Sequence, residues 1–255
     1  FIVDIHGLEH IQDKNLVKGF PITSWKKYGY IAKSIYYKKV ENKLFKNAIH
    51  LICSSEDIQE KVEKIQNSTL VRNAVFVDEF LPSENSELKI VLVGPFLPGT
   101  INFEGLNIIS KIVKKFPKIK FTFIGKTNEF FKNQLKNENT EFLGVVDDYE
   151  NTLRKYSVLF APYPNHAKYL GSKNKFLEAA ACKMPIITTS SGAVDFRNDL
   201  LSIGDTTEKI SNLIKYLMDE NNRRDIGNKL RKEIEEKYNA EIEVKKIVKL
   251  YNEYD

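Results

Sequence analysis

The sequence of 255 residues has few cysteines, few histidines and no long apolar run. Spanning a bilayer takes about 20 consecutive apolar residues, so an integral membrane protein is not expected. Cys53 and Cys182 lie among apolar residues, away from each other and from any histidine cluster. We therefore expect both cysteines to be buried and reduced, as in a cytoplasmic protein. The four histidines are scattered and lack the spacing of metal ligands, so no metal site is expected.

A strong excess of charge is missing as well. The net charge of +5 is too small to indicate binding of nucleic acid. It suits anionic small molecules or an anionic membrane surface. Hydrophobic residues make up 42% of the chain and charged residues 29%, a balance that allows a sizeable buried core. At about 150 residues per domain, the length favours two domains or one large domain.

From residue 89 onward, apolar strands alternate with helical stretches. The expected strands are residues 89–93, 121–124, 141–143, 158–161 and 185–188. Because these strands are apolar throughout, they predict a parallel sheet that helices cover on both faces. Ligands of such sheets bind at the carboxyl ends of the strands, which here are the loops at Gly94, Gly125, Gly144 and residues 163–171. No G-x-G-x-x-G motif follows a strand, so a nicotinamide or flavin dehydrogenase is not expected.

The first part of the chain has a similar alternation. Residues 1–7 predict a buried strand that runs into a turn, and residues 49–53 predict a second strand, followed by a helix with a serine cap. A third, short strand is expected at residues 69–72. Residues 82–87 are polar, contain a proline and lack periodicity, so they are expected to form a domain linker.

One segment brings a loop of small residues, a helix and a buried strand into immediate succession. Gly171 and Ser172 let the backbone turn, and the helix that begins near Lys173 directs its unsatisfied N–H groups at an anion over the loop. Lys175 adds a positive charge. Glu178 lies three residues later on the same helical face, where a carboxylate can accept hydrogen bonds from two ribose hydroxyls. The segment predicts a nucleotide site, and the alternative is a solvated Lys-Glu pair on an ordinary helix.

Short motifs along the whole chain resemble one family in their order and spacing. These motifs are residues 4–7, 51–55, 71–74, 90–94, 121–125, 142–146, 161–164 and 175–192. Together they resemble the glycosyltransferases of family four, the glycosyl transferases group 1, which have the GT-B fold. The first three motifs are similar to the acceptor domain of that family from its middle onward. The other five are similar to its donor domain.

The resemblance implies an α/β fold of two Rossmann-like domains whose parallel sheets face a cleft. Residues 1–82 would belong to the acceptor-binding domain, which is expected to be incomplete because Phe1 falls in the middle of it. Residues 83–238 would form the donor-binding domain. Residues 239–255 have the apolar period of an amphipathic helix, which the resemblance places across the first domain.

The resemblance also implies a reaction. Such an enzyme transfers a hexose from a UDP-sugar or GDP-sugar to a glycan or lipid-linked acceptor, with retention of configuration and without a metal or other cofactor. Without Mg²⁺, the protein itself must neutralise the departing diphosphate. We expect Lys175, the helix start at residues 171–173 and Lys126 to do so, and the donor nucleotide to contact Gly94 and Val145.

The match to the family pattern has two departures. Glu178 matches the second glutamate of the family's Glu-x7-Glu pattern, which holds the donor ribose, but Leu170 stands in place of the first. Pro95 and Glu104 stand where the family commonly has Arg and Lys. Some branches of the family use Gly-x3-Lys-x2-Glu instead, and the segment from Gly171 to Glu178 fits that spacing.

His6 and the loop after residue 161 supply the remaining candidates. Family members often carry a histidine near the sugar or diphosphate at the end of this strand, and Asp4 projects to the same side of the strand, where it could orient the imidazole of His6. The alternatives are a buried core histidine and a carboxylate that caps a turn. Tyr163 and Asn165 could line the sugar pocket or could lie on the loop surface.

The sequence is also compatible with other functions and with a membrane contact. A non-catalytic or half-enzyme subunit could bind the nucleotide sugar and need a second chain to complete its first domain. A sugar-nucleotide epimerase of the same fold is disfavoured because the acidic catalytic set of that family is not found. Residues 25–46 interleave lysines with aromatic and aliphatic residues, as in a helix that holds a peripheral protein at the cytoplasmic face of an anionic membrane. The alternative is a helix whose apolar stripe packs on its own sheet.

Overall fold

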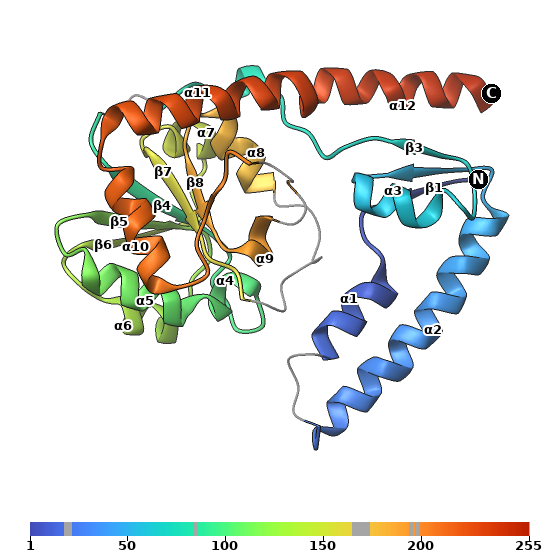
Figure 1. Ribbon diagram of the computed structural model, residues 1–255, viewed down its shortest axis with the longest axis horizontal. Coiled ribbons are helices and arrows are strands. Elements are labelled where there is room, and N and C mark those ends of the chain that lie inside the picture. Colours follow the sequence, from blue (N-terminus) through green and yellow to red (C-terminus); the bar gives the residue numbers. More distant parts are fainter. Residues whose placement is uncertain (18–21, 84–85, 165–173, 194–195, 197–198, 255) are drawn as a thin grey trace.

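The computed structural model describes residues 1–17, 22–83, 86–164, 174–193, 196 and 199–254. They form two α/β units, each built on a parallel sheet (Figure 1). The first sheet has the strand order β1-β2-β3, and the second has the order β6-β5-β4-β7-β8-β9. The expected α/β fold with parallel sheets is confirmed.

The first unit alternates strands and helices. Its elements are β1 (Ile2–Ile5), α1 (Glu9–Leu16), α2 (Trp25–Asn47), β2 (His50–Cys53), α3 (Glu56–Val62) and β3 (Ser68–Leu70). Strand β2 is buried along its whole length because it lies between β1 and β3. The side chain of Ser55 caps α3 by accepting a hydrogen bond from the N–H of Ile58, as the sequence predicts. Strand β3 begins one residue earlier than expected and ends two residues earlier.

Helix α2 packs against α1, and the pair projects away from the three-stranded sheet (Figure 1). The hydroxyl of Ser34 on α2 donates to the carbonyl oxygen of His10 on α1 at 2.7 Å. Large apolar side chains of α2 lie in solvent: Trp25 is 78% exposed, Tyr36 64% and Ile35 56%. Toward its end, α2 packs Phe45 against Ile5 and Leu51 of the sheet. The apolar side chains of its first half do not pack on that sheet, contrary to the alternative for this helix.

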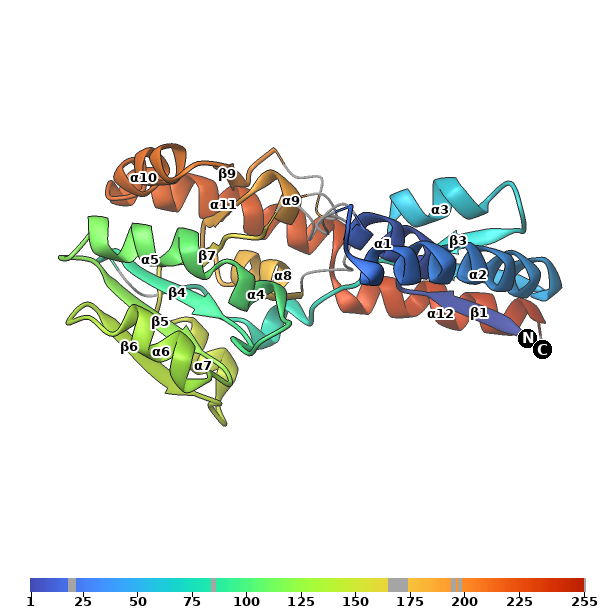
Figure 2. The same ribbon diagram turned by 90° about the horizontal axis from the view of Figure 1, so that it is seen from below.

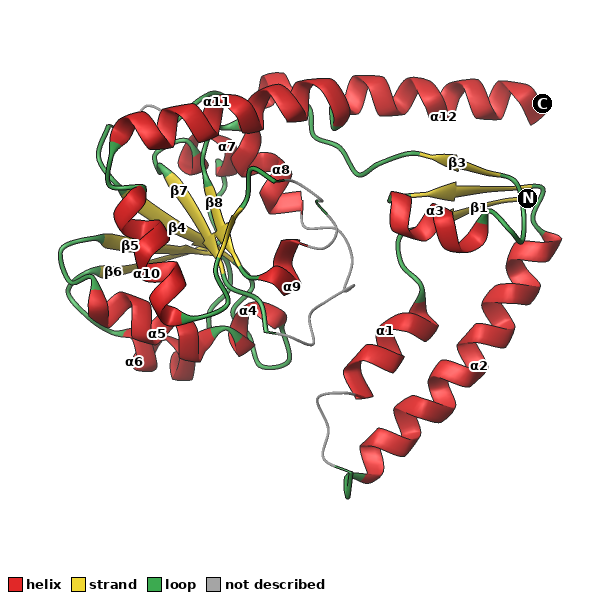
Figure 3. Ribbon diagram, in the orientation of Figure 1, coloured by secondary structure: helices red, strands yellow, loops and turns green. Residues whose placement is uncertain are grey.

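The second unit contains most of the helices and the larger sheet (Figure 3). Its elements are the 3₁₀ turn η2 (Val77–Glu79), β4 (Lys89–Val93), α4 (Ile101–Glu104), α5 (Leu106–Lys115), β5 (Lys120–Ile124), α6 (Glu129–Leu135), β6 (Thr140–Gly144), α7 (Tyr149–Leu153), β7 (Val158–Ala161), α8 (Asn174–Ala181), β8 (Ile186–Thr188), α9 (Ser190–Ala193), β9 (Ser202–Ile203), α10 (Thr207–Tyr216) and α11 (Glu220–Lys237). Strand β4 lies between β5 and β7, so the strand order reverses beside it. A reversal of this kind leaves a crevice at the carboxyl ends of the strands, where ligands bind.

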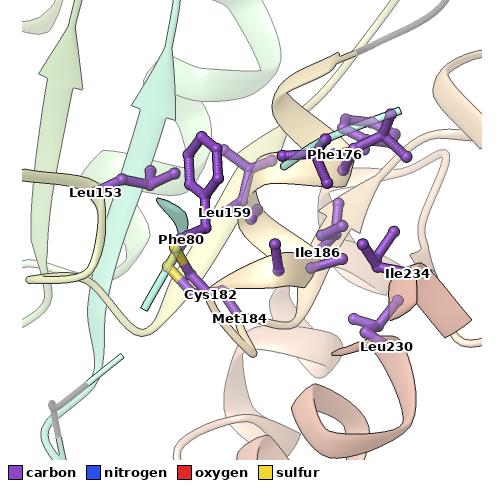
Figure 4. Close-up of a cluster of buried hydrophobic side chains, with 14 of the residues drawn as sticks. Phe80, Leu153, Leu159, Phe176, Cys182, Met184, Ile186, Leu230 and Ile234 are labelled. Carbon is purple, nitrogen blue, oxygen red and sulfur yellow. The ribbon is translucent and has the colours of Figure 1, made fainter. Parts of the chain in front are cut away.

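Two buried clusters cover the two faces of the six-stranded sheet. One cluster joins α5, α6 and α10 to the sheet. The other joins α7, α8 and α11 to it, and Figure 4 shows Leu159, Phe176, Ile186 and Leu230 of this cluster. Helix α8, which carries the predicted nucleotide-binding residues, is thus fixed by its apolar side between the sheet and α11. A helix held in this way presents its polar side chains at a defined position.

Cys53 and Cys182 are free and buried, as predicted. Burial raises the pKa of the Cys53 thiol to about 11 and that of the Cys182 thiol to about 12. Both thiols are therefore protonated at neutral pH and unreactive. In the described parts of the chain, every helix is too short or too polar to span a membrane.

The chain crosses between the two units twice, and the two crossings lie side by side. The first crossing follows β3 and the second joins α11 to α12 (Ala240–Tyr254). The N–H of Val75 donates to the carbonyl oxygen of Tyr238, and the N–H of Ala240 donates to that of Val75, both at 3.0 Å. Val77 and Phe80 already pack in the core of the second unit. The second unit therefore begins upstream of the polar residues 82–87 that the sequence suggests as a linker.

Helix α12 extends from the second unit along the sheet of the first (Figures 1 and 2). Leu250 packs with Ile52 and Val71 of the first unit. Near the end of the helix, the hydroxyl of Tyr254 lies 3.0 Å from Nδ1 of His50, which is buried. The C-terminal helix therefore packs on the first unit, where the sequence placed it.

Candidate functional site

Three glycines end neighbouring strands at the carboxyl edge of the six-stranded sheet. Gly94 follows β4, Gly125 follows β5 and Gly144 ends β6. Gly125 and Gly144 have φ angles of 117° and 72°, in the region that favours glycine. A Cβ atom on Gly125 would lie only 3.0 Å from the carbonyl oxygen of Gly94. Glycine at position 125 thus lets the ends of β4 and β5 approach closely, at the edge where a ligand of a parallel sheet binds. The ring of Phe96 packs against Gly94, whereas the space beside Gly144 is open.

Lys175 lies in the first turn of α8, beside the end of β4. Its Nζ donates to the carbonyl oxygen of Val93 at 2.7 Å and to Oδ1 of Asn102 at 2.6 Å. The ammonium group also lies 5.1 Å from the centre of the Tyr163 ring, close enough for a cation–π interaction. The elements α4, β4 and α8 therefore hold one half-buried positive charge at the carboxyl edge of the sheet.

Glu178 lies one turn further along α8, and its Oε2 accepts a hydrogen bond from the hydroxyl of Tyr149 at 2.7 Å. Burial raises the pKa of the Glu178 carboxyl, and the nearby Glu150 adds to the rise. The hydrogen bond from Tyr149 and the charge of Lys175 act in the opposite direction. Burial also raises the pKa of the Tyr149 phenol, which therefore keeps its proton and stays a donor.

His6 follows β1 in the first unit and faces the second. Its Nε2 lies 3.2 Å from Oδ2 of Asp4, so the two side chains share one side of the strand as expected. The side chain of His6 is 67% exposed, which excludes a buried core histidine. His6 and Arg72 line a pocket between the units whose other wall includes Phe176 of α8. The pocket holds about 790 Å³ of empty space, part of it open to solvent.

The other predicted residues lie in different surroundings. Gly171, Ser172, Lys173 and Asn165 lie outside the described residues. Lys126 and Val145 are exposed just after Gly125 and Gly144, at the same edge of the sheet.

Tyr163 is 2% exposed, so it neither lies on the loop surface nor offers an open wall to a sugar. Its ring packs beneath Lys175 and beside Phe176. Apolar surroundings hold the ring in place, and burial raises the pKa of its phenol. In this structure the ring contacts the ammonium of Lys175, and a contact of Tyr163 with the donor stays a prediction.

Two residues of this edge were missed from the sequence, Asn102 and Tyr149. Each contacts a predicted residue across a long stretch of chain: Asn102 lies 73 residues from Lys175, and Tyr149 lies 29 residues from Glu178. An asparagine in a short helix and a tyrosine at a helix start are common on any protein surface. No local pattern in the sequence distinguishes them.

Several solved structures share this fold. TarM of S. aureus aligns with 98% of this chain and 50% of its own, at 17% identity and a TM-score of 0.72. Sucrose-phosphate synthase from Thermosynechococcus elongatus aligns with 99% of this chain and 67% of its own, at 17% identity and a TM-score of 0.74. Anabaena HepE, solved with UDP-glucose, aligns with 99% and 72% at 11% identity and a TM-score of 0.71. At these identities the likeness concerns the fold, and this chain spans half the length of TarM.

The sequence itself matches a family over the donor half. No curated protein matches the chain. The model of the family described as Glycosyl transferases group 1 matches residues 87–220, which is more than half of the chain. This segment includes the three strand-end glycines, Lys175 and Glu178. The chain, with its GT-B fold and this match, belongs to the glycosyl transferases group 1 family.

Proposed function

We propose that this protein transfers a hexose from a nucleoside-diphosphate sugar, a UDP-sugar or a GDP-sugar, to a glycan or lipid-linked acceptor. The observation that carries the proposal is the placement of Lys175 and Glu178 on α8 at the carboxyl edge of the six-stranded sheet. Phe176 and Leu177, on the same helix, line the pocket that His6 lines from the other unit. The family supports transfer of a sugar. The structure of HepE with UDP-glucose supports a nucleotide-sugar donor by likeness of fold.

In this proposal the six-stranded unit binds the donor. The ammonium of Lys175 neutralises the diphosphate, together with Lys126 and the N–H groups at the start of α8. Glu178 accepts hydrogen bonds from the ribose hydroxyls. The exposed Val145 and the backbone of Gly94 border the nucleotide. The first unit, with α12 across its sheet, holds the acceptor.

The transfer breaks the bond between the anomeric carbon and the diphosphate and forms a bond to the acceptor hydroxyl on the same face of the sugar, which retains the configuration. The acceptor proton leaves with the diphosphate. Negative charge grows on the diphosphate as it departs, so fixed positive charge beside it stabilises the transition state. Among the described residues no group of three or more His, Cys, Asp and Glu side chains could hold a metal ion. We propose that Lys175 and Lys126 supply this charge, without a metal. His6, oriented by Asp4, contacts the sugar or its diphosphate from the opposite wall.

Titration with UDP-, GDP- and ADP-sugars tests the donor part of this proposal. We expect one nucleotide to bind most tightly, with the same affinity in the presence of a metal chelator. Product analysis by NMR with that donor and a panel of glycan acceptors should then show the donor's own anomeric configuration. Failure of all these nucleotide sugars to bind would overturn the proposed function, and an inverted product or loss of transfer with chelator would overturn the corresponding part of the mechanism.

A second function, a half-enzyme subunit that needs a partner chain, is favoured by the first sheet. In the described residues, β1 is an edge strand of a parallel sheet of three strands, and an edge strand presents backbone N–H and C=O groups that can pair with another strand. A partner chain could pair with this edge. Donor binding that depends on Glu178, without transfer or hydrolysis of the sugar by the chain alone, would favour this second function over the first.

We also propose that α2 contacts an anionic membrane at the cytoplasmic face, which would bring the acceptor unit to a lipid-linked substrate. The helix carries lysines at positions 26, 27, 33, 38, 39, 43 and 46. Its exposed aromatic residues Trp25, Tyr28 and Tyr36 are of the type that anchors proteins in the headgroup layer. The acidic residue of this helix, Glu41, contacts His10 of α1.

A further inference from the structure

We propose that Asn102 and Tyr149 are positioning residues of the donor site. Asn102 holds Lys175 toward the diphosphate, and Tyr149 holds Glu178 toward the ribose. This inference rests on the proposed function, because it assigns roles to side chains that support the two proposed donor-binding residues. The elements involved, α4, α7 and α8, come from three separate parts of the chain.

Asn102 connects Lys175 to the loop that follows β4. Its Nδ2 donates to the carbonyl oxygen of Pro95 at 3.1 Å, and its Oδ1 accepts from Lys175 at 2.6 Å. The contact with Pro95 fixes which end of the amide faces the lysine, because only the NH₂ group can donate to a carbonyl. With Val93 as the second acceptor, the flexible stem of Lys175 is held at two points before a donor arrives. A lysine held in this way loses less side-chain freedom when it binds a phosphate.

The position of Pro95 gives this contact its importance. Pro95 stands where the family commonly has an arginine, so the loop after β4 brings no guanidinium to the diphosphate. Asn102 instead connects the backbone of this loop to the ammonium of Lys175. One lysine with a fixed position then carries more of the diphosphate charge than it would beside an arginine.

Tyr149 acts on Glu178 in a similar way. Its hydroxyl donates to Oε2 of Glu178 at 2.7 Å, which orients the plane of the carboxylate and directs Oε1 as an acceptor for a ribose hydroxyl. The same hydrogen bond favours the ionised carboxylate against the effect of burial. The ionised form accepts hydrogen bonds at both oxygens, as two neighbouring ribose hydroxyls require.

Neither side chain is needed to start its own helix. The hydroxyl oxygen of Thr100 accepts from the N–H of Phe103 and caps α4. The carboxylate of Asp148 accepts from the N–H of Asn151 and caps α7. Oδ1 of Asn102 and the hydroxyl of Tyr149 are thus directed to α8, and changing these side chains leaves the caps of both helices in place.

The experiment uses the full chain and measures affinity calorimetrically for UDP, for GDP and for uridine and guanosine. The variants are Asn102→Ala and Tyr149→Phe. Their matched controls are Asn107→Ala and Tyr216→Phe, at exposed positions on α5 and α10. For whichever diphosphate binds the wild type, Asn102→Ala should weaken binding about threefold to tenfold and leave the nucleoside unaffected. Tyr149→Phe should weaken binding of both the diphosphate and its nucleoside. It should also reduce the preference for the nucleoside over its 2′-deoxy form.

A pH profile separates positioning from a merely structural role. The charged and titratable groups that face Glu178 are Tyr149, Lys175, Glu150 and the protonated thiol of Cys182. Because Tyr149 lowers the pKa of the Glu178 carboxyl, Tyr149→Phe should raise the pH at which diphosphate affinity falls on acidification. Asn102→Ala should leave that pH unchanged. If Asn102→Ala does not fold, Asn102→Asp replaces it, because the carboxylate keeps Lys175 in place but neutralises it and should weaken UDP or GDP binding only.

The outcomes distinguish the two proposals. A wild type that binds neither UDP nor GDP overturns the proposed function. A wild type that binds one of them, with weaker binding in Lys175→Ala and Glu178→Gln but unchanged affinity and pH profile in Asn102→Ala and Tyr149→Phe, overturns the positioning roles alone. Weaker binding in the control variants as well would also overturn them, because the effect would then not be specific to this edge.

Discussion

Lys175 is the residue of α8 that supplies positive charge to the proposed donor site. Lys175→Ala removes a charge-assisted hydrogen bond to phosphate, worth about 1.5–3 kcal/mol. Donor affinity should therefore fall about 10- to 150-fold, as measured by calorimetry with the best-binding nucleotide sugar. Lys111→Ala, at an exposed position on α5, is the control and should bind as the wild type does. Equal affinity in the two variants would contradict the assignment of Lys175.

The ionised Glu178, which is proposed to bind the donor ribose, lowers the free energy of unfolding. Burial raises the pKa of its carboxyl above the usual 4.5, so the folded state resists the ionisation that the unfolded chain undergoes. The resulting loss of stability is absent below the unfolded pKa and develops as the pH rises through the folded pKa. Glu178→Gln should therefore unfold at higher urea concentration than the wild type at about pH 7, with the difference lost at about pH 4, and should bind donor ribose weakly. A variant that is less stable than the wild type at neutral pH would contradict this.

His6 offers a test of the opposite wall of the pocket. Because the side chain is exposed and touches Asp4, His6→Ala should lower turnover at least about tenfold while the melting temperature and donor affinity change little. Asp4→Asn keeps the size of the partner but removes its charge, so it should have a smaller effect in the same direction. Normal turnover per folded molecule in His6→Ala would show that the histidine has no part in the reaction.

At the scale of elements, the proposed contact of α2 with a membrane can be tested by binding to vesicles. Each lysine near an anionic leaflet contributes on the order of 1 kcal/mol to the free energy of membrane binding. The protein should sediment with vesicles that contain about 30% anionic lipid, more at low salt than at high salt. Replacing Lys26, Lys27, Lys38 and Lys39 by glutamine should release it.

The second unit supplies a matched control for that experiment. Lys111, Lys114, Lys115 and Lys118 are exposed in and after α5, and their replacement by glutamine changes the net charge by the same amount. That variant should still sediment. Equal release of both variants would mean that net charge alone drives the binding, and no sedimentation of the wild type at low salt would exclude the contact.

Most elements were predictable from the sequence, because apolar strands and capped helices leave local patterns. Strand β3 was placed too late because its three residues are all half-buried and show no contrast between faces. The exposure of Trp25 and Tyr36 was not predictable, since a helical period does not say what covers the apolar side.

In the candidate site, the contacts of Asn102 and Tyr149 were not predictable, because they depend on the order of strands in the sheet. Lys175 and Glu178 were found because both lie on one helix after a small-residue loop.

At the scale of the whole molecule, Glu243 fastens α12 to the first unit. Its side chain is 4% exposed, and its Oε2 accepts from the backbone N–H of Arg72 at 3.0 Å. Lys246 lies 2.7 Å from Oε1. Glu243→Ala leaves buried donors unsatisfied and should cost about 1–3 kcal/mol in the free energy of unfolding. The exposed Glu241 on the same helix is the control.

The two variants should differ in how they unfold. In Glu243→Ala the first unit should become sensitive to proteolysis before the second does, because the helix that joins them is loosened. Glu241→Ala should unfold as the wild type does. Identical denaturant midpoints and cleavage patterns for the two variants would contradict the role of Glu243.

The paired crossings at Val75 and Tyr238 have a mechanical consequence. Two separate tethers would let the units twist, slide and tilt independently. Because Val75 bonds to Tyr238 and Ala240 on the other crossing, the two crossings form one connection rather than two independent ones. In the proposed enzyme, this single connection sets the position of an acceptor on the first unit relative to a donor on the second.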